Sequence, residues 1–388
     1  MSWAGLTGFA WSDYDTEVAP AFQRLIAGDM GGFLGMLPAY GGSLVLRAPF
    51  ARATAVLGGG ELAVYRAVSI PCLVAVAWLA VVLVRRMGER GRSSGVRALV
   101  LGLCVVNPIT LRALEVGHPE ELLAAALAIG AVLLAADGRA LLAAVLLGLA
   151  IATKQWAVLA IGPVLLALPG RRVLALAIAG AVTAAVLAPI FLAGSHDALV
   201  RGTATTGGTI FQPWQLFWPL GEAGHVVIGG DGLPKPDGYR VPPEWLSPLT
   251  HPLIALLVVP ASLLWARLRG AAAGEQVLVL LALLLLVRCM LDPWNTIYYA
   301  LPFLLALLAW EALQRPARPP VLAVVATVLV WVTFQRAPQW LSPDMQCAFF
   351  LAWSLPLAAW LAREAFAPGA WLPARGDSRS RARLNAAA

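Results

Sequence analysis

Residues 276–299 read QVLVLLALLLLVRCMLDPWNTIYY, an apolar run that ends in charged, amide and aromatic side chains. Comparable stretches recur along the chain, and some of them reach the roughly 20 residues that a bilayer-spanning helix needs. They are 66–84, 96–107, 120–136, 140–153, 156–168, 172–193, 252–267, 276–289, 298–313, 320–334 and 346–363. We therefore predict an all-α polytopic membrane protein with about eleven transmembrane or re-entrant helices.

The composition supports a bilayer as the solvent. Hydrophobic residues make up 60% of the 388 residues and charged residues only 13%, whereas a soluble domain carries about 25% charged residues. The net charge of +7 does not indicate nucleic-acid binding, because no basic stripe with interleaved aromatic residues exists. Membrane lipid is the expected surrounding partner.

The polar loops sort into two alternating sets. When charges near the end of an apolar segment are counted with the adjoining loop, one set is Arg-rich, with 17 basic and 6 acidic residues, and the other holds 11 basic residues, 15 acidic residues and all four His. The positive-inside rule places the Arg-rich set in the cytoplasm. It predicts a multi-pass plasma-membrane protein with a cytoplasmic, basic C-terminal tail over 364–388.

The chain reads as one integral membrane domain over 1–388. Residues 1–65 form a predicted outer loop, and 194–251, rich in Gly, Pro and Trp, a predicted irregular outer loop over the membrane face. Met1–Ala10 resembles the outer end of a helix whose beginning is missing, so a first helix is expected upstream. The alternative is a translocated N-terminus.

Acidic side chains cluster where the first loop leaves the membrane, in Trp11-Ser-Asp13-Tyr-Asp15-Thr-Glu17. An extended segment would put the three carboxylates on one side, while a helix would spread them. Repulsion within such a cluster can leave one carboxylate as a base. Divalent-cation binding and an ordinary solvated charge run are the alternatives.

Other charged residues stand at predicted membrane boundaries. Arg112, Glu115 and His118 would share one face of a helix, whereas Glu120 and Glu121 suit the first turn of the next helix and its dipole. Such boundary charges usually have partners or functions.

Two segments interrupt or end apolar helices with a cation. Lys154-Gln155-Trp156 breaks an apolar hairpin, so Lys154 either meets a phosphate or snorkels to the interface. Arg288 lies four residues before Asp292, as a structural ion pair or as an anion site.

The remaining candidates are aromatic and amide residues of the outer loops. They suit a sugar or isoprenoid surface, with an interfacial aromatic belt as the alternative. They are Gln212, Trp214, Trp218, Trp294, Asn295 and Tyr298, with Arg201 as a further anion candidate. The cysteines show no metal or disulfide spacing, although Cys289 and Cys347 both lie near the outer face, where a bridge is an alternative.

An acidic residue after the first helix, an amphipathic loop with Leu25-Ile-Ala-Gly28 and a later Tyr40-Gly-Gly-Ser43 resemble the GT-C superfamily. These are polytopic glycosyltransferases that use polyprenyl-phosphate sugars, and the nearest group is bacterial, largely actinobacterial, and mannosyltransferase-like. The resemblance implies a first-loop carboxylate as catalytic base, which falls on Asp13 or Asp15. Asp13 is preferred because it is nearer the membrane exit.

The resemblance also implies transfer of a sugar, with mannose favoured, to a lipid-linked or cell-envelope acceptor on the non-cytoplasmic face. Arg112, Lys154, Arg201 and Arg288 form the pool for the donor phosphate. The substrate-binding candidates are Glu17, Glu115, His118, Gln155, Gln212, Trp214, Trp218, Asp292, Trp294, Asn295 and Tyr298. No cofactor and no metal site is expected, with a divalent cation left open. The rival readings are a transporter or flippase of envelope lipids and a non-catalytic assembly protein.

Overall fold

The structure is a computed structural model, and it describes residues 13–38, 40–193, 211–223, 238–270, 273–315 and 318–367. The expected upstream helix end at Met1–Ala10, the anion candidate Arg201 and the tail beyond 367 lie outside these ranges. Within them the chain is helical, and the only extended pairing is an isolated bridge between Glu222 and Val241.

The described residues form the following helical elements. In chain order they are η1 (Tyr14–Val18), α2 (Ala19–Ile26), α3 (Met30–Gly35), α4 (Gly41–Val56), α5 (Glu61–Glu89), α6 (Ser94–Val105), α7 (Pro108–Val116), α8 (Glu120–Ala136), α9 (Ala140–Thr153), η2 (Gln155–Ala160), α10 (Ile161–Ala167), α11 (Arg172–Leu192), η3 (Trp218–Leu220), α13 (Leu246–Leu256), α14 (Val258–Arg269), η4 (Gly274–Val277), α15 (Leu278–Leu291), η5 (Ile297–Ala300), α16 (Leu301–Gln314), α17 (Val321–Trp331), η6 (Val332–Arg336), η7 (Ala337–Gln339) and α18 (Pro343–Phe366).

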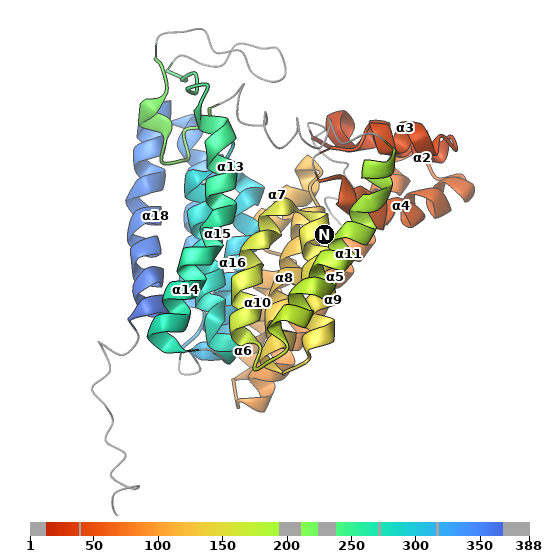
Figure 1. Ribbon diagram of the computed structural model, residues 1–388. Helices are drawn as coiled ribbons and strands as arrows, with labels where there is room; N and C mark the ends of the chain where they lie inside the picture. The colour runs from red at the N-terminus through yellow and green to blue at the C-terminus, as the bar shows by residue number, and fades with distance from the viewer. Residues whose placement is uncertain are drawn as a thin grey trace, which may run out of the picture.

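The long helices run side by side as a bundle (Figure 1). Among the described residues, eight stretches are long and apolar enough to cross a membrane: Glu61–Glu89, Ser94–Val116, Arg172–Leu192, Pro248–Arg269, Gly274–Leu291, Ile297–Gln314, Val321–Gln339 and Pro343–Phe366. The predicted all-α polytopic class is therefore confirmed. The other predicted segments are the shorter helices α8, α9 and α10, of which α8 is nearly all buried and α9 leaves Leu141 and Leu142 exposed.

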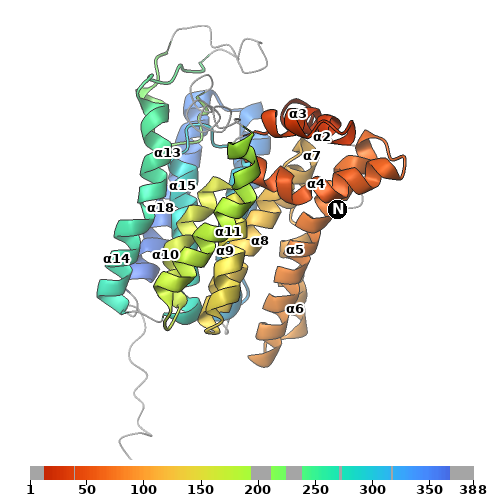
Figure 2. The same cartoon turned by 45° about the vertical axis from the view of Figure 1, so that its right-hand side comes forward.

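The middle of the bundle is formed by α8, α15 and α16, whose side chains are nearly all buried. An apolar helix that is hydrophobic all round belongs in such an interior position. The N-terminal helices α2 and α3 instead lie across one end of the bundle (Figures 1 and 2). In α2, Phe22 and Leu25 are buried while Gln23 and Arg24 are exposed, so the predicted amphipathic helix of the first loop is present.

The loops of the bundle meet at two opposite ends. At one end Arg86 pairs with Asp137 at 2.6 Å and with Glu275, which also pairs with Arg90. These groups come from the Arg-rich set of loops that the sequence analysis placed together. The acid-rich set meets at the other end, beside α2 and α3, and there it encloses a cavity.

All four cysteines are buried and free, so the alternative bridge between Cys289 and Cys347 is absent. The Cys289 thiol contacts the Tyr299 carbonyl at 3.2 Å, and the Cys347 thiol lies 3.7 Å from the Gln215 carbonyl. Each thiol is used as a small packing group inside a helix interface.

Candidate active site

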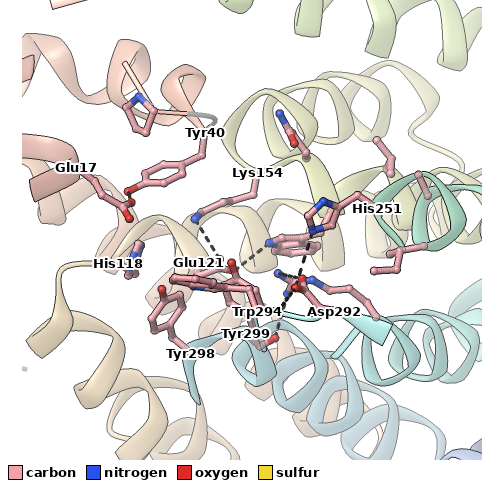
Figure 3. A pocket seen from close by; sticks show the side chains of 17 residues that line it. Glu17, Tyr40, His118, Glu121, Lys154, His251, Asp292, Trp294, Tyr298 and Tyr299 are labelled. Carbon is pink, nitrogen blue, oxygen red and sulfur yellow. Dashed lines mark hydrogen bonds and ion pairs between the residues drawn. The ribbon is translucent and has the colours of Figure 1, made fainter. Parts of the chain in front are cut away.

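A cavity of about 440 Å³ lies at the acid-rich end of the bundle. Its walls come from η1, the link before α4, the α7–α8 turn, the break between α9 and η2, α13 and the α15–η5 segment (Figure 3). Residues far apart in sequence therefore share one space. They include Glu17, Tyr40, His118, Glu121, Lys154, Gln155, Trp156, His251, Arg288, Asp292, Trp294, Tyr298 and Tyr299.

The acidic run after residue 12 is helical, so the extended alternative is wrong. Residues Tyr14–Val18 form a turn of π-helix that continues directly into α2, and such turns often occur at functional sites. The turn spreads the carboxylates, as a helix must. Glu17 lines the cavity and accepts a hydrogen bond from the Tyr40 hydroxyl, whereas Asp15 leaves a buried oxygen without a hydrogen-bond partner, and burial raises its pKa.

Asp13 is held by two residues of the cavity wall. Its Oδ2 lies 2.9 Å from Nε2 of His118 and accepts a hydrogen bond from the Tyr298 hydroxyl at 3.2 Å. The two holding rings stack on each other with centroids 4.1 Å apart. The Asp13 side chain keeps 29% of its surface exposed, while that of His118 keeps only 3%. The two contacts therefore fix the orientation of the Asp13 carboxylate.

Glu120 is the centre of a buried ionic cluster. Its carboxylate lies 2.7 Å from His118 Nδ1, 3.2 Å from Lys154 Nζ and 3.3 Å from Arg47 Nη2, and it is completely buried. Its neighbour Glu121 pairs with Lys154 at 3.3 Å and accepts a hydrogen bond from the Trp156 indole at 2.9 Å. The sequence analysis expected both glutamates to stabilise the helix dipole, and it did not predict this cluster.

Tyr40 and Arg47 are the other residues that the sequence analysis missed. The Tyr40 ring lies under the Lys154 ammonium, 3.8 Å from the centroid, and the Arg47 guanidinium is also fixed by Ser43 Oγ at 2.9 Å. Tyr40 belongs to the quoted Tyr40-Gly-Gly-Ser43 motif, which was the available signal. Arg47 lies in the middle of a helix, and the sequence does not show that its side chain is buried.

Local backbone geometry explains how these groups converge. Gly117 ends α7 in the left-handed region at φ +101°, where glycine is favoured, and a Cβ there would lie 2.5 Å from the Tyr14 Cβ. Lys154 has extended dihedrals between α9 and η2. The predicted break at 153–156 is thus real, and it turns the Lys154 side chain into the cavity (Figure 3).

The far wall of the cavity carries Arg288 and Asp292. Arg288 donates to the Tyr299 carbonyl at 3.1 Å, lies 4.2 Å from the centroid of the Tyr299 ring and stands 4.0 Å from the Asp292 carboxylate. Asp292 also accepts the backbone N–H of Trp294 at 3.0 Å and faces His251 at 3.9 Å. A buried guanidinium with one carboxylate at 4.0 Å can still bind an anion.

The electrostatics of the wall favour charged forms. Burial alone would lower the pKa of His118, but the carboxylates of Glu120 and Asp13 outweigh it and raise that pKa to about 9. Burial would likewise lower the pKa of Lys154, and Glu121 and Glu120 raise it instead. Burial would raise the pKa of the Asp292 carboxyl, yet its contacts with His251 and Arg288 keep it low.

Several predicted candidates lie away from the cavity wall. Arg112 and Glu115 pair with each other at 2.7 Å as i, i+3 neighbours. Trp214 packs on Phe334 and its carbonyl accepts the Asn295 amide at 2.7 Å.

The loop around Gln212 and Trp218 is held by structural contacts. The Gln212 backbone N–H bonds to the Pro293 carbonyl, and the Trp218 indole donates to Asp344 at 2.7 Å. Among the described residues, no group of three or more His, Cys, Asp or Glu could hold a metal ion.

The described residues thus form a helical bundle with eight candidate membrane spans and a charged cavity at one end. Residues 42–170, about a third of the chain, match the MptA_B family model, described as alpha-(1->6)-mannopyranosyltransferase, N-terminal domain. This match supports the resemblance to GT-C-like mannosyltransferases and supports a glycosyltransferase activity. The comparisons with curated proteins and with solved structures found no match.

Proposed function

We propose that the protein transfers a mannosyl group from a polyprenyl-phosphate donor to a lipid-linked or cell-envelope acceptor on the non-cytoplasmic face. The family match supports mannosyl transfer. The absence of a nucleotide-binding motif in the sequence suits a lipid-linked donor. The cavity lies at the end where the acid-rich loops meet, which the positive-inside rule assigns to the outside.

Asp13 is the proposed general base. The observation that supports this role is the contact of its Oδ2 with His118 and Tyr298, which both lie in the cavity wall. Asp13 removes the proton of the acceptor hydroxyl as that oxygen bonds to the anomeric carbon. The bond from this carbon to the phosphate oxygen breaks, polyprenyl phosphate leaves with the electron pair, and the anomeric configuration inverts.

Arg288 is the leading candidate for the donor phosphate. It is 5% exposed and lines the cavity, and guanidinium groups suit bidentate phosphate binding. Lys154 lies nearer the base and already pairs with two carboxylates, so it contributes charge to the same space but is less available. Gln155, Trp294 and Tyr298 line the remaining wall for sugar or prenyl groups.

The test is transfer of radiolabelled mannose from polyprenyl-phosphate mannose by the purified full-length chain. We expect Asp13→Asn to lower kcat by at least about 100-fold, since general-base catalysis contributes about 10²–10⁴-fold. Asp15→Asn and the exposed control Arg24→Gln should stay within about threefold of wild type. Wild-type activity in Asp13→Asn would refute the assignment of the base, and a selective loss in Glu17→Gln would transfer the role to Glu17, a carboxylate of the same acidic run that lines the cavity.

A further inference from the structure

The ring of His118 joins two carboxylates. Nε2 lies 2.9 Å from Asp13, and Nδ1 lies 2.7 Å from Glu120. We infer that His118 and Glu120 are positioning residues, which hold the Asp13 carboxylate in the orientation that faces the acceptor. This inference rests on the proposed function, because it assigns a role relative to Asp13 as base.

The ring is fixed in this orientation by packing. His118 is 2% exposed, Tyr298 stacks on one face, and Tyr40 meets it edge-on with centroids 5.8 Å apart. A rotation of the ring would break both nitrogen contacts. The imidazole therefore transmits the position of Glu120 to Asp13.

The same contacts define the charge of the ring. An ionised carboxylate only accepts hydrogen bonds, so two carboxylates on the two nitrogens require an N–H at each. That form is the imidazolium, which carries one positive charge between two negative ones. A neutral ring would leave one nitrogen lone pair facing a carboxylate oxygen, which is repulsive.

Glu120 is itself held from three elements. Arg47 approaches from α4, Lys154 from the break between α9 and η2, and His118 from the turn before α8. The other charged groups that face this cluster are Glu121 and Glu17. Since three cations converge on a completely buried carboxylate, Glu120 cannot shift without moving α4. It therefore gives the His118 ring a rigid support.

We expect His118 to affect catalysis through the orientation of Asp13 and not through binding of the donor. A misplacement of about 1 Å at a reacting group can cost about 10²-fold in rate. We therefore expect His118→Ala to lower kcat by about 30- to 100-fold with the donor KM changed less than about threefold. His118→Gln, whose amide can still donate to Asp13, should regain about tenfold over His118→Ala.

The pH profile separates positioning from a merely structural role. The pKa of His118 is raised, so the imidazolium persists at neutral pH and is lost as pH rises through about 9. The kcat of wild type should fall on that alkaline side. His118→Gln should lack this fall because an amide does not titrate, whereas Tyr298→Phe, which removes the other donor to Asp13, should keep it. An unchanged alkaline fall in His118→Gln, or wild-type kcat in His118→Ala, would overturn the inference.

A second measurement needs no turnover. The chain has four His, so ¹⁵N-histidine labelling of the full-length protein gives few signals, and His118→Gln assigns the one of interest. Both ring nitrogens should be protonated at pH 7.5, and Glu120→Gln should lower the pH at which they titrate. A neutral ring at pH 7.5 would refute the inference that a charged His118 ring joins Asp13 to Glu120. If wild type transferred no mannose from the polyprenyl donor, the proposed function would fail, and this titration would still test the contact between His118 and the two carboxylates.

Discussion

At the scale of single residues, the cluster around Glu120 is the most constrained part of the protein. A buried ion pair contributes little by itself, but removal of one partner leaves an uncompensated buried charge. Arg47 is 1% exposed, and its nitrogens contact Glu120, the Ser43 hydroxyl and the Ser43 carbonyl. Loss of the Arg47 side chain should therefore lower the free energy of unfolding more than it changes the rate of transfer.

We expect Arg47→Met to destabilise the protein by about 3 kcal/mol, the usual cost of breaking a buried pair from one side. Arg24→Met is the matched control, because the Arg24 side chain is 58% exposed in a surface pair with Asp29. A thiol-reactive dye can follow thermal unfolding in detergent, since all four cysteines are buried and free in the folded protein. Equal unfolding temperatures for the two variants would contradict a structural role of the cluster.

Sequence pattern could not reveal Glu120 as the centre of this cluster. Arg47 lies 73 residues before it, and helical spacing relates only residues three or four apart. By contrast, the interpretation of His118 as more than a boundary charge rested on its cost at a membrane edge. Its position in the cavity wall agrees with that expectation, and its role stays a proposal.

At the scale of elements, the α7–α8 turn positions both the ring and the base. Gly117 closes α7 with a left-handed backbone and lets η1 approach, since its missing Cβ would stand 2.8 Å from the Tyr14 backbone nitrogen. Asp13 directly precedes Tyr14. The turn thus fixes His118 on one side and the segment that carries Asp13 on the other.

We expect Gly117→Ala to lower kcat by about tenfold or more while the chain stays folded, because the added methyl group must push η1 and Asp13 away. Gly95→Ala in α6 is the control, since a Cβ there meets nothing within 4 Å. Mannosyl transfer and thermal unfolding should be measured on the same preparations. Equal kcat values in the two variants would mean that a displacement of η1 does not change the position of Asp13 enough to affect transfer.

Helix positions were predictable to the extent that apolar runs end at polar residues. The predicted segments 120–136 and 140–153 coincide with α8 and α9, because charged or glycine-containing turns bound them. The start of α13 at Leu246 was not predicted; the apolar run was drawn from 252, since Pro248 and His251 interrupt its pattern. The helical form of the acidic segment was left open, because alternating acids fit either conformation.

At the scale of the whole molecule, the two sets of loops meet at opposite ends of the bundle. The ion pairs of Arg86 with Asp137 and Arg315 with Glu364 belong to one end. The contacts of Asp13, Lys154 and Asp292 belong to the other. The alternation of loop charges in the sequence has this three-dimensional counterpart, and the positive-inside rule orients it.

We expect a membrane-impermeant maleimide to label Trp340→Cys in intact cells and Arg139→Cys only after permeabilisation. Trp340 is 74% exposed at the cavity end, and Arg139 is exposed at the Arg-rich end. The native cysteines are buried and should give little background. The reverse pattern would place the cavity on the cytoplasmic face and refute the lipid-donor proposal with it.

The cavity wall comes from three parts of the chain, and Glu17 and Tyr40 belong to the first of them, before residue 42. The matched region 42–170 supplies His118, Glu121 and Lys154, while Arg288, Asp292 and Tyr298 come from beyond its end. A chimera that joined this region to the counterpart of residues 274–314 from a protein with a similar N-terminal region would combine parts of the wall from two parents. Its preference for donor and acceptor would then show which parent determines specificity. If the chimera were active, one N-terminal region could be combined with different C-terminal regions in enzymes that make different products.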